Sequence, residues 1–80
     1  MAETNSNDVI IREGDLVTLK EEYLRVGEDP MELFEVFVSF EDMKRCLIAP
    51  HNPRSERPQE LVSWDMITLK VPKELAEKLN

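Results

Sequence analysis

The chain has 80 residues, of which 41% are apolar and 34% are charged, and its formal net charge is -7. A chain of this length buries only about 60% of its unfolded surface, so we predict one small domain with a limited core and little room for a deep catalytic pocket. The excess of acidic residues disfavours nucleic-acid binding, because proteins that bind phosphate backbones usually carry a basic surface.

The charges are unevenly distributed along the chain. Residues 1–42 hold 12 acidic and 3 basic residues, whereas residues 43–80 hold 5 acidic and 7 basic residues. Either the two halves attract each other in the fold, or the acidic half faces a basic partner.

The single cysteine, Cys46, has no partner for an intrachain disulfide, so we expect a buried thiol and a cytoplasmic protein.

The predicted elements begin after a polar segment, residues 1–8, which we expect to be disordered and which has no apolar stretch typical of a secretory signal. Residues 9–12 are predicted to form a short lead-in strand. The Glu-Gly-Asp sequence at 13–15 predicts a turn, because glycine tolerates positive φ and aspartate bonds to nearby backbone. Residues 16–20 then have the apolar character of a second strand.

The stretch from residue 30 to residue 47 is compatible with a helix or with a β-hairpin. A helix would have Asp29 as its N-cap and Pro30 at its first position. A strand over residues 34–40 is favoured, because five of these seven residues are phenylalanine or valine. Alternate apolar residues of this strand are expected to point into the core: Phe34, Val36, Val38 and Phe40.

A tight turn at residues 41–42 is expected to lead into a returning strand over residues 43–49. Cys46 and Ile48 would point inward from that strand. Residues 50–59 contain three prolines and almost no apolar residues, which predicts an exposed loop.

The last part of the chain predicts two more short strands and a terminal helix. The strands cover residues 60–64 and 67–71, and Pro72 can open a short helix after them. Together these elements predict a mainly β fold, a small five-stranded barrel with a short C-terminal helical turn. Closure into a barrel is favoured because it removes exposed sheet edges.

Two short sequences carry a resemblance to a known fold family. GDLVTLK, residues 14–20, resembles the opening of small bacterial and phage SH3-like barrels, where a Gly-Asp turn leads into a strand that ends in lysine. ELVSWDMITLK, residues 60–70, is similar to the closing strands of such domains, with a tight turn between the last two. The resemblance covers residues 13–71 and implies an SH3-like fold. The chain lacks the basic character of the nucleic-acid-binding members, and the aromatic-rich acidic loop and paired tryptophans of the members that bind proline-rich peptides.

The sequence contains no recognisable catalytic or metal-binding set. One histidine, His51, and one cysteine do not make a zinc site, and the acidic pairs lack EF-hand spacing. Two glycines are too few for a loop that cradles phosphates, and no apolar run approaches the ~20 residues of a membrane helix. We therefore expect no enzymatic activity, no cofactor, no metal and no membrane association.

The sequence favours a non-catalytic module that binds another protein through an acidic surface. The candidate contact residues are four acids of the first half and two arginines of the proline-rich loop: Glu21, Glu22, Glu28, Asp29, Arg54 and Arg57. The alternative is a nucleic-acid-related role, either as an acidic mimic of DNA or as a weak binder through basic residues: Lys44, Arg45, Arg54 and Arg57. Two loop arginines neutralise about two phosphates, whereas strong binders contact about 6–10, so direct nucleic-acid binding is expected to be unimportant.

Trp64, the only tryptophan, is expected in the core or as a partly exposed anchor.

Overall fold

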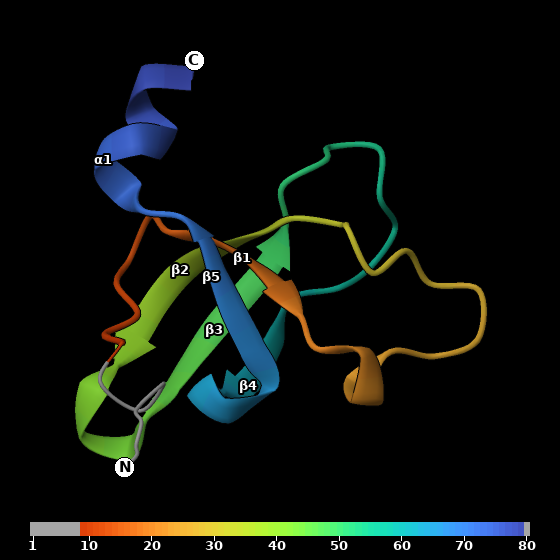
Figure 1. Cartoon of the computed structure of the whole chain (residues 1–80), viewed down its shortest axis with the longest axis horizontal. Helices are drawn as coiled ribbons and strands as arrows, with labels where there is room; N and C mark the ends of the chain where they lie inside the picture. Colours follow the sequence, from red (N-terminus) through yellow and green to blue (C-terminus); the bar gives the residue numbers. More distant parts are fainter. Residues whose placement is uncertain (1–8, 80) are drawn as a thin grey trace, which may run out of the picture.

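The computed structural model describes residues 9–79 and shows a mainly β fold with a short C-terminal helix (Figure 1). Five antiparallel strands form one sheet in the order β4-β3-β2-β1-β5. The strands are β1 (Leu16–Leu19), β2 (Phe34–Phe40), β3 (Arg45–Pro50), β4 (Glu60–Ser63) and β5 (Ile67–Val71). They are followed by α1 (Lys73–Ala76) and the 3-10 turn η5 (Glu77–Leu79). The predicted class, the five strands and the terminal helix are confirmed.

Two predictions about the N-terminal part have different outcomes. Residues 9–12 form no strand, so the predicted lead-in strand is wrong. Their polar contacts explain this, because the Ile11 carbonyl accepts a hydrogen bond from the Ser39 hydroxyl at 2.6 Å and the Arg12 amide donates to the Asp15 carboxylate. The predicted disorder of residues 1–8 lies outside the described residues.

A strand occupies residues 34–40, so the helix alternative for this stretch is wrong. The pairing of β2 with β3 shifts between Val36, which faces Ile48, and Val38, which faces Leu47. Phe37 is thus an extra residue in β2, a β-bulge. A single inserted residue moves every later side chain of the strand to the opposite face of the sheet.

The bulge overturns half of the core predicted for β2. Phe34 is only 2% exposed and Val36 is fully buried, as expected. Val38 and Phe40 are each 40% exposed, so the prediction that they point inward is wrong. Ser39 takes the position that faces the buried Cys46 across the ladder.

The connection between β2 and β3 is longer than the predicted two-residue turn. It consists of the 3-10 turn η3 (Glu41–Met43) and Lys44, which has a left-handed backbone with φ of 55°. A chain reversal at this point needs a residue with positive φ, and the sequence has no glycine there. The returning strand β3 buries Cys46 and Ile48, as predicted.

The turn that precedes β1 is joined to the C-terminal helix. The Asp15 carboxylate is buried and accepts hydrogen bonds from the backbone amides of Arg12 at 2.8 Å and Lys73 at 2.7 Å. Gly14 has φ of 96°, and a Cβ atom there would lie 3.0 Å from the Lys73 side chain. The predicted turn is present, and its aspartate also caps the start of α1.

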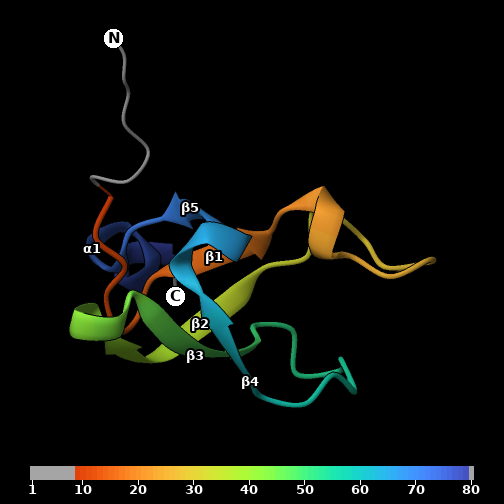
Figure 2. The same ribbon diagram turned by 90° about the horizontal axis from the view of Figure 1, so that it is seen from below.

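The sheet is strongly curled, so that β1 and β5 lie over β3 and β4 when the molecule is seen from below (Figure 2). Every strand contributes to one core, whose largest fully buried side chains are Val17, Val36, Cys46, Ile48 and Val62. The 3-10 turn η4 (Trp64–Met66) connects β4 directly to β5, and these are the two edge strands of the sheet. Within residues 9–79, β4 and β5 do not pair with each other, so closure into a barrel is not confirmed.

Candidate binding groove

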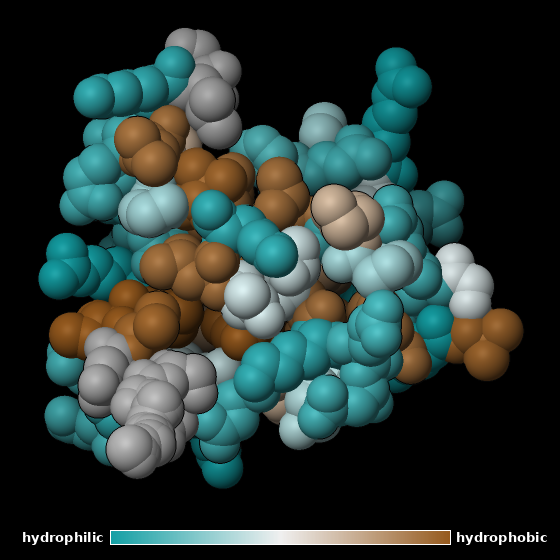
Figure 3. All heavy atoms as spheres, viewed as in Figure 1, coloured by the Kyte–Doolittle hydropathy of each residue, from teal (hydrophilic) through white to brown (hydrophobic). Residues whose placement is uncertain are grey.

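A groove of about 430 Å³ lies between β5 and residues 9–11, at the end of the sheet where η4 turns the chain. Its apolar floor comes from four side chains: Ile11, Trp64, Ile67 and Leu69. All four belong to the core cluster or pack against it. The face of the molecule that β5 crosses carries a band of apolar side chains, whereas the loops beside it are largely polar (Figure 3). The groove is therefore an extension of the core to the surface.

The Trp64 ring is held in a fixed position. The backbone amide of Trp64 donates to the Lys44 carbonyl at 2.8 Å, and its indole Nε1–H donates to the Arg45 carbonyl at 3.1 Å. The side chain is neither fully buried nor fully exposed. A tryptophan that has its polar atom bonded and part of its ring accessible is the type of residue that anchors binding partners.

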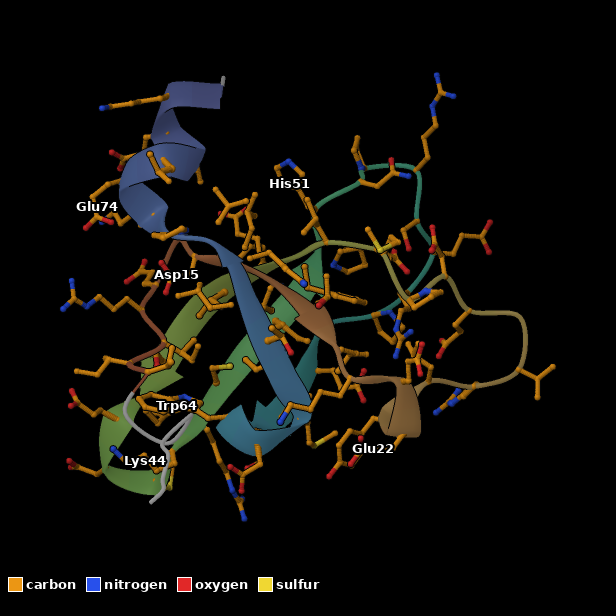
Figure 4. The ribbon with its side chains drawn as sticks, in the orientation of Figure 1. Asp15, Glu22, Lys44, His51, Trp64 and Glu74 are labelled. Carbon is orange, nitrogen blue, oxygen red and sulfur yellow. The ribbon has the colours of Figure 1, made fainter. Side chains whose placement is uncertain are left out.

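Lysines lie at the rim of the groove. The Lys44 ammonium lies 4.8 Å from the centroid of the Trp64 ring, a cation–π distance (Figure 4). Lys20 is positioned at the end of β1 by a backbone hydrogen bond to the Met66 carbonyl at 2.9 Å. Asp65 is the only acidic residue among the described residues that line the groove. The described residues that line the groove thus include two lysines and one aspartate, in a chain whose net charge is -7.

The candidate residues Glu28 and Arg57 are brought together in the structure. The Arg57 guanidinium forms an ion pair with Glu28, lies 3.4 Å from a Glu60 carboxylate oxygen, and lies 5.2 Å from the centroid of the Phe34 ring. The Arg25 amide donates to the Glu28 carboxylate at 2.6 Å. This hydrogen bond, and then the Arg57 guanidinium, lowers the pKa of Glu28, and partial desolvation opposes them. Glu28 and Arg57 are thus engaged with each other.

The other candidate residues lie apart from this ion pair. Glu21 and Glu22 are exposed on the 3-10 turn η2 (Glu21–Tyr23), which directly follows Lys20, and Figure 4 shows Glu22 to the right of Trp64 in the lower part of the view. Asp29 accepts a hydrogen bond from the Met31 amide at 2.9 Å in a local turn, and Arg54 is exposed on the long loop.

Most of the groove could not be predicted from the sequence. The sequence indicates Trp64 as a candidate anchor and Lys44 as a candidate for nucleic-acid binding alone. Nothing in the sequence places Lys20 or Thr68 near Trp64. Their positions follow from the pairing of β1 with β5, in which Thr18 faces Thr68 and Leu19 faces Ile67.

No catalytic arrangement was found in the part of the chain that the structure describes. Cys46 is buried, and desolvation raises the pKa of its thiol to about 11, which suppresses the reactive thiolate. A second hollow of about 420 Å³ lies between β2 and α1 and includes His51, which is exposed and lies far from Trp64 (Figure 4). Residues 9–79 contain no cluster of three or more His, Cys, Asp or Glu side chains that could hold a metal ion. No helix in this range is long and apolar enough to cross a membrane.

Comparison with known proteins adds no relative to these observations. No family model matches the sequence, and no curated protein or solved structure gives a significant match.

Proposed function

We propose that this chain is a non-catalytic, cytoplasmic protein-interaction module of SH3-like architecture, and that the groove beside Trp64 receives part of its partner. The observation that carries the proposal is a single, rigidly held tryptophan that lies in an apolar groove under a rim of lysines. The short turn η4 between the last two strands agrees with the resemblance of the closing sequence to SH3-like domains.

The proposal moves the main contact away from the acidic residues. Glu28 already has a cationic partner within the chain, which leaves Glu21 and Glu22 as the exposed carboxylates of η2. These two residues are a secondary contact in the proposal. A basic partner reaching them would gain rate from charge attraction more than affinity, since exposed charges are screened beyond about 8 Å at physiological salt.

The nucleic-acid alternative gains no support from the loop arginines. Arg57 is directed to Glu28, Glu60 and Phe34, so only Arg54 of the two extends from the loop toward solvent. Mimicry of DNA requires carboxylates spaced like phosphates along one surface. The engagement of Glu28 with Arg57 interrupts the predicted acidic set, and mimicry stays a prediction without a specific observation in its favour.

Site-specific photocrosslinking tests the proposal without disturbing the core. A photoreactive amino acid is placed at Thr68, which is exposed and lines the groove, and in a matched control at Glu74, which is exposed on α1. We expect a defined protein from a lysate of the native host to be captured at Thr68 and not at Glu74. Equal capture at both positions, or none at Thr68, would refute a partner site in the groove.

A further inference from the structure

We propose that the ligand of the groove is an extended segment of a partner protein, alternating apolar and acidic residues, that pairs as an additional strand with the edge of β5 that faces away from β1. This inference rests on the proposed function and specifies the partner and the way it binds. It draws on the edge of the sheet, the shape of the groove floor and the charge of its rim.

The edge of β5 is available to a new strand. β5 is the last strand in the order of the sheet and pairs with β1; within residues 9–79 no strand pairs with its other edge. The groove runs beside three consecutive residues of β5, Ile67, Thr68 and Leu69. Figure 1 shows β5 crossing in front of β3, with residues 9–12 farther to the left. An exposed edge presents unpaired backbone amides and carbonyls, which is the template that an extended peptide uses in β-augmentation.

The floor of the groove selects apolar side chains at alternate positions. Successive side chains of a strand point to opposite faces, so alternate residues of a peptide on β5 would lie about 7 Å apart over the floor. Trp64 and Leu69 offer apolar surface there, and both pack against the core. Apolar residues of the peptide would thus cover surface that is now partly exposed.

The rim selects acidic residues between the apolar ones. Lys20 and Lys44 lie at the rim, and Asp65 is the single acidic residue among the described residues that line the groove. The ion pairs found within residues 9–79 both involve Arg57, on another part of the molecule. Carboxylates of the peptide would meet the lysines, whereas a basic peptide would meet like charges there and gain nothing from the groove.

A peptide is favoured over single-stranded nucleic acid for two reasons. Nucleic-acid grooves stack successive bases on several aromatic rings along a basic track. This groove has one aromatic ring, Trp64, and the net charge of the chain is -7. The strand edge, in contrast, is suited to backbone pairing with a peptide.

Trp64 provides a direct reporter, because it is the only tryptophan in the chain. The full chain is titrated with an acetylated, amidated octapeptide that alternates valine and glutamate, and Trp64 fluorescence and calorimetry are followed. We expect saturable binding. A peptide with lysine in place of glutamate, and an N-methylated glutamate peptide that cannot pair along an edge, should each bind at least about tenfold more weakly.

A pair of charge-matched double variants tests the role of the rim. Lys20→Glu with Lys44→Glu should weaken binding of the glutamate peptide at least about tenfold. Arg54→Glu with Lys78→Glu makes the same change in net charge at exposed positions outside both the groove and β5, and should leave binding within about twofold of the parent. Circular dichroism of the parent and the two double variants confirms that each variant is folded before its affinity is interpreted.

Several results would overturn the inference: equal binding of the glutamate and lysine peptides, full binding of the N-methylated peptide, tighter binding of an octathymidylate, or no binding of any probe. Each of these is distinguishable from failure of the proposed function. If crosslinking at Thr68 still captures a partner, the interaction module stands and only the assigned ligand chemistry is wrong. If Thr68 captures nothing more than Glu74 does, the module proposal itself is wrong.

Discussion

Two contacts between a cation and an aromatic ring lie at different places in this small sheet, and they differ in what surrounds them. Arg57 lies over Phe34, which is buried, and the guanidinium is also held by Glu28 and Glu60. Lys44 lies over Trp64, which is partly accessible and borders a groove. We refer to the first as the closed contact and to the second as the open contact.

The comparison shows how the same pair of chemical groups can serve stability or recognition. In the closed contact, the cation has carboxylate partners and the ring is part of the core, so removal of either group should affect folding. In the open contact, the lysine lies at the rim of a groove, so its removal should affect binding more than folding. A cation–π contact contributes about 0.5–1 kcal/mol at an exposed site and more when it is desolvated.

The largest expected effect comes from the ring of the closed contact. Phe34→Ala should lower the free energy of unfolding by about 3–5 kcal/mol, because the ring is buried and its removal leaves a cavity. Phe40→Ala, six residues later in the same strand, should cost less than about 1 kcal/mol, because that ring is 40% exposed after the bulge. Urea denaturation of both variants measures the difference. Equal losses would contradict the bulge at Phe37.

The fate of Phe40 shows which part of the fold could be predicted from the sequence. The strand conformation of β2 could be predicted from its phenylalanine and valine content. The exposed loop at residues 50–59 could be predicted from its prolines. The bulge could not be predicted, because one extra residue leaves local composition unchanged while it reverses every later side chain. The left-handed conformation of Lys44 could not be predicted for a related reason, since the sequence has no glycine there to mark it.

The candidate site was less predictable than the fold. Glu28 and Arg57 were both candidate residues, but they are 29 residues apart, and only the structure shows that they pair. Their pairing agrees with one interpretation of the charge asymmetry, in which the acidic and basic halves of the chain attract each other. The groove depends on the register between β1 and β5 and on the position of residues 9–11, which no local pattern specifies.

A second prediction tests whether the groove beside Trp64 gives reagents in solution access to the buried core. Cys46 follows Arg45, whose carbonyl accepts the Trp64 indole hydrogen bond, yet its thiol is fully buried. Burial raises the pKa of the thiol from 9.0 to about 11. At pH 8 the thiolate fraction should fall about 100-fold relative to an unperturbed cysteine, and lack of access slows the reaction further. Labelling by iodoacetamide should therefore be at least about 100-fold slower in the native protein than in urea, and comparable rates would show that the groove exposes the core.

A third, smaller effect compares the two cations directly. Arg57→Met and Lys44→Met each keep an apolar stem and remove a charge. We expect Arg57→Met to lower the urea midpoint, because it leaves two carboxylates and a buried ring without their cation. Lys44→Met should change the midpoint little, because Lys44 is exposed. If Lys44→Met lowered the urea midpoint more than Arg57→Met does, the assignment of the closed and open contacts would be reversed.

The smallest expected effect is the pH dependence of the closed contact. The Arg25 amide, and then Arg57, lowers the pKa of Glu28 in the folded protein, so the unfolded chain takes up a proton at this residue at a higher pH than the folded protein does. The stabilisation from Glu28 is therefore present above the ordinary carboxyl range and is lost as the pH falls through the lowered pKa.

Glu28→Gln should consequently remove part of the acid destabilisation between about pH 5 and pH 2, while the other carboxylates titrate as in the parent. Arg57→Met should reduce this part without abolishing it, because the Arg25 amide is the larger cause of the lowered pKa. Urea midpoints measured across this range, as differences from the parent, isolate the contribution of Glu28. If the parent and Glu28→Gln curves differ only by a constant offset at every pH, the closed contact does not depend on the charge of this carboxylate.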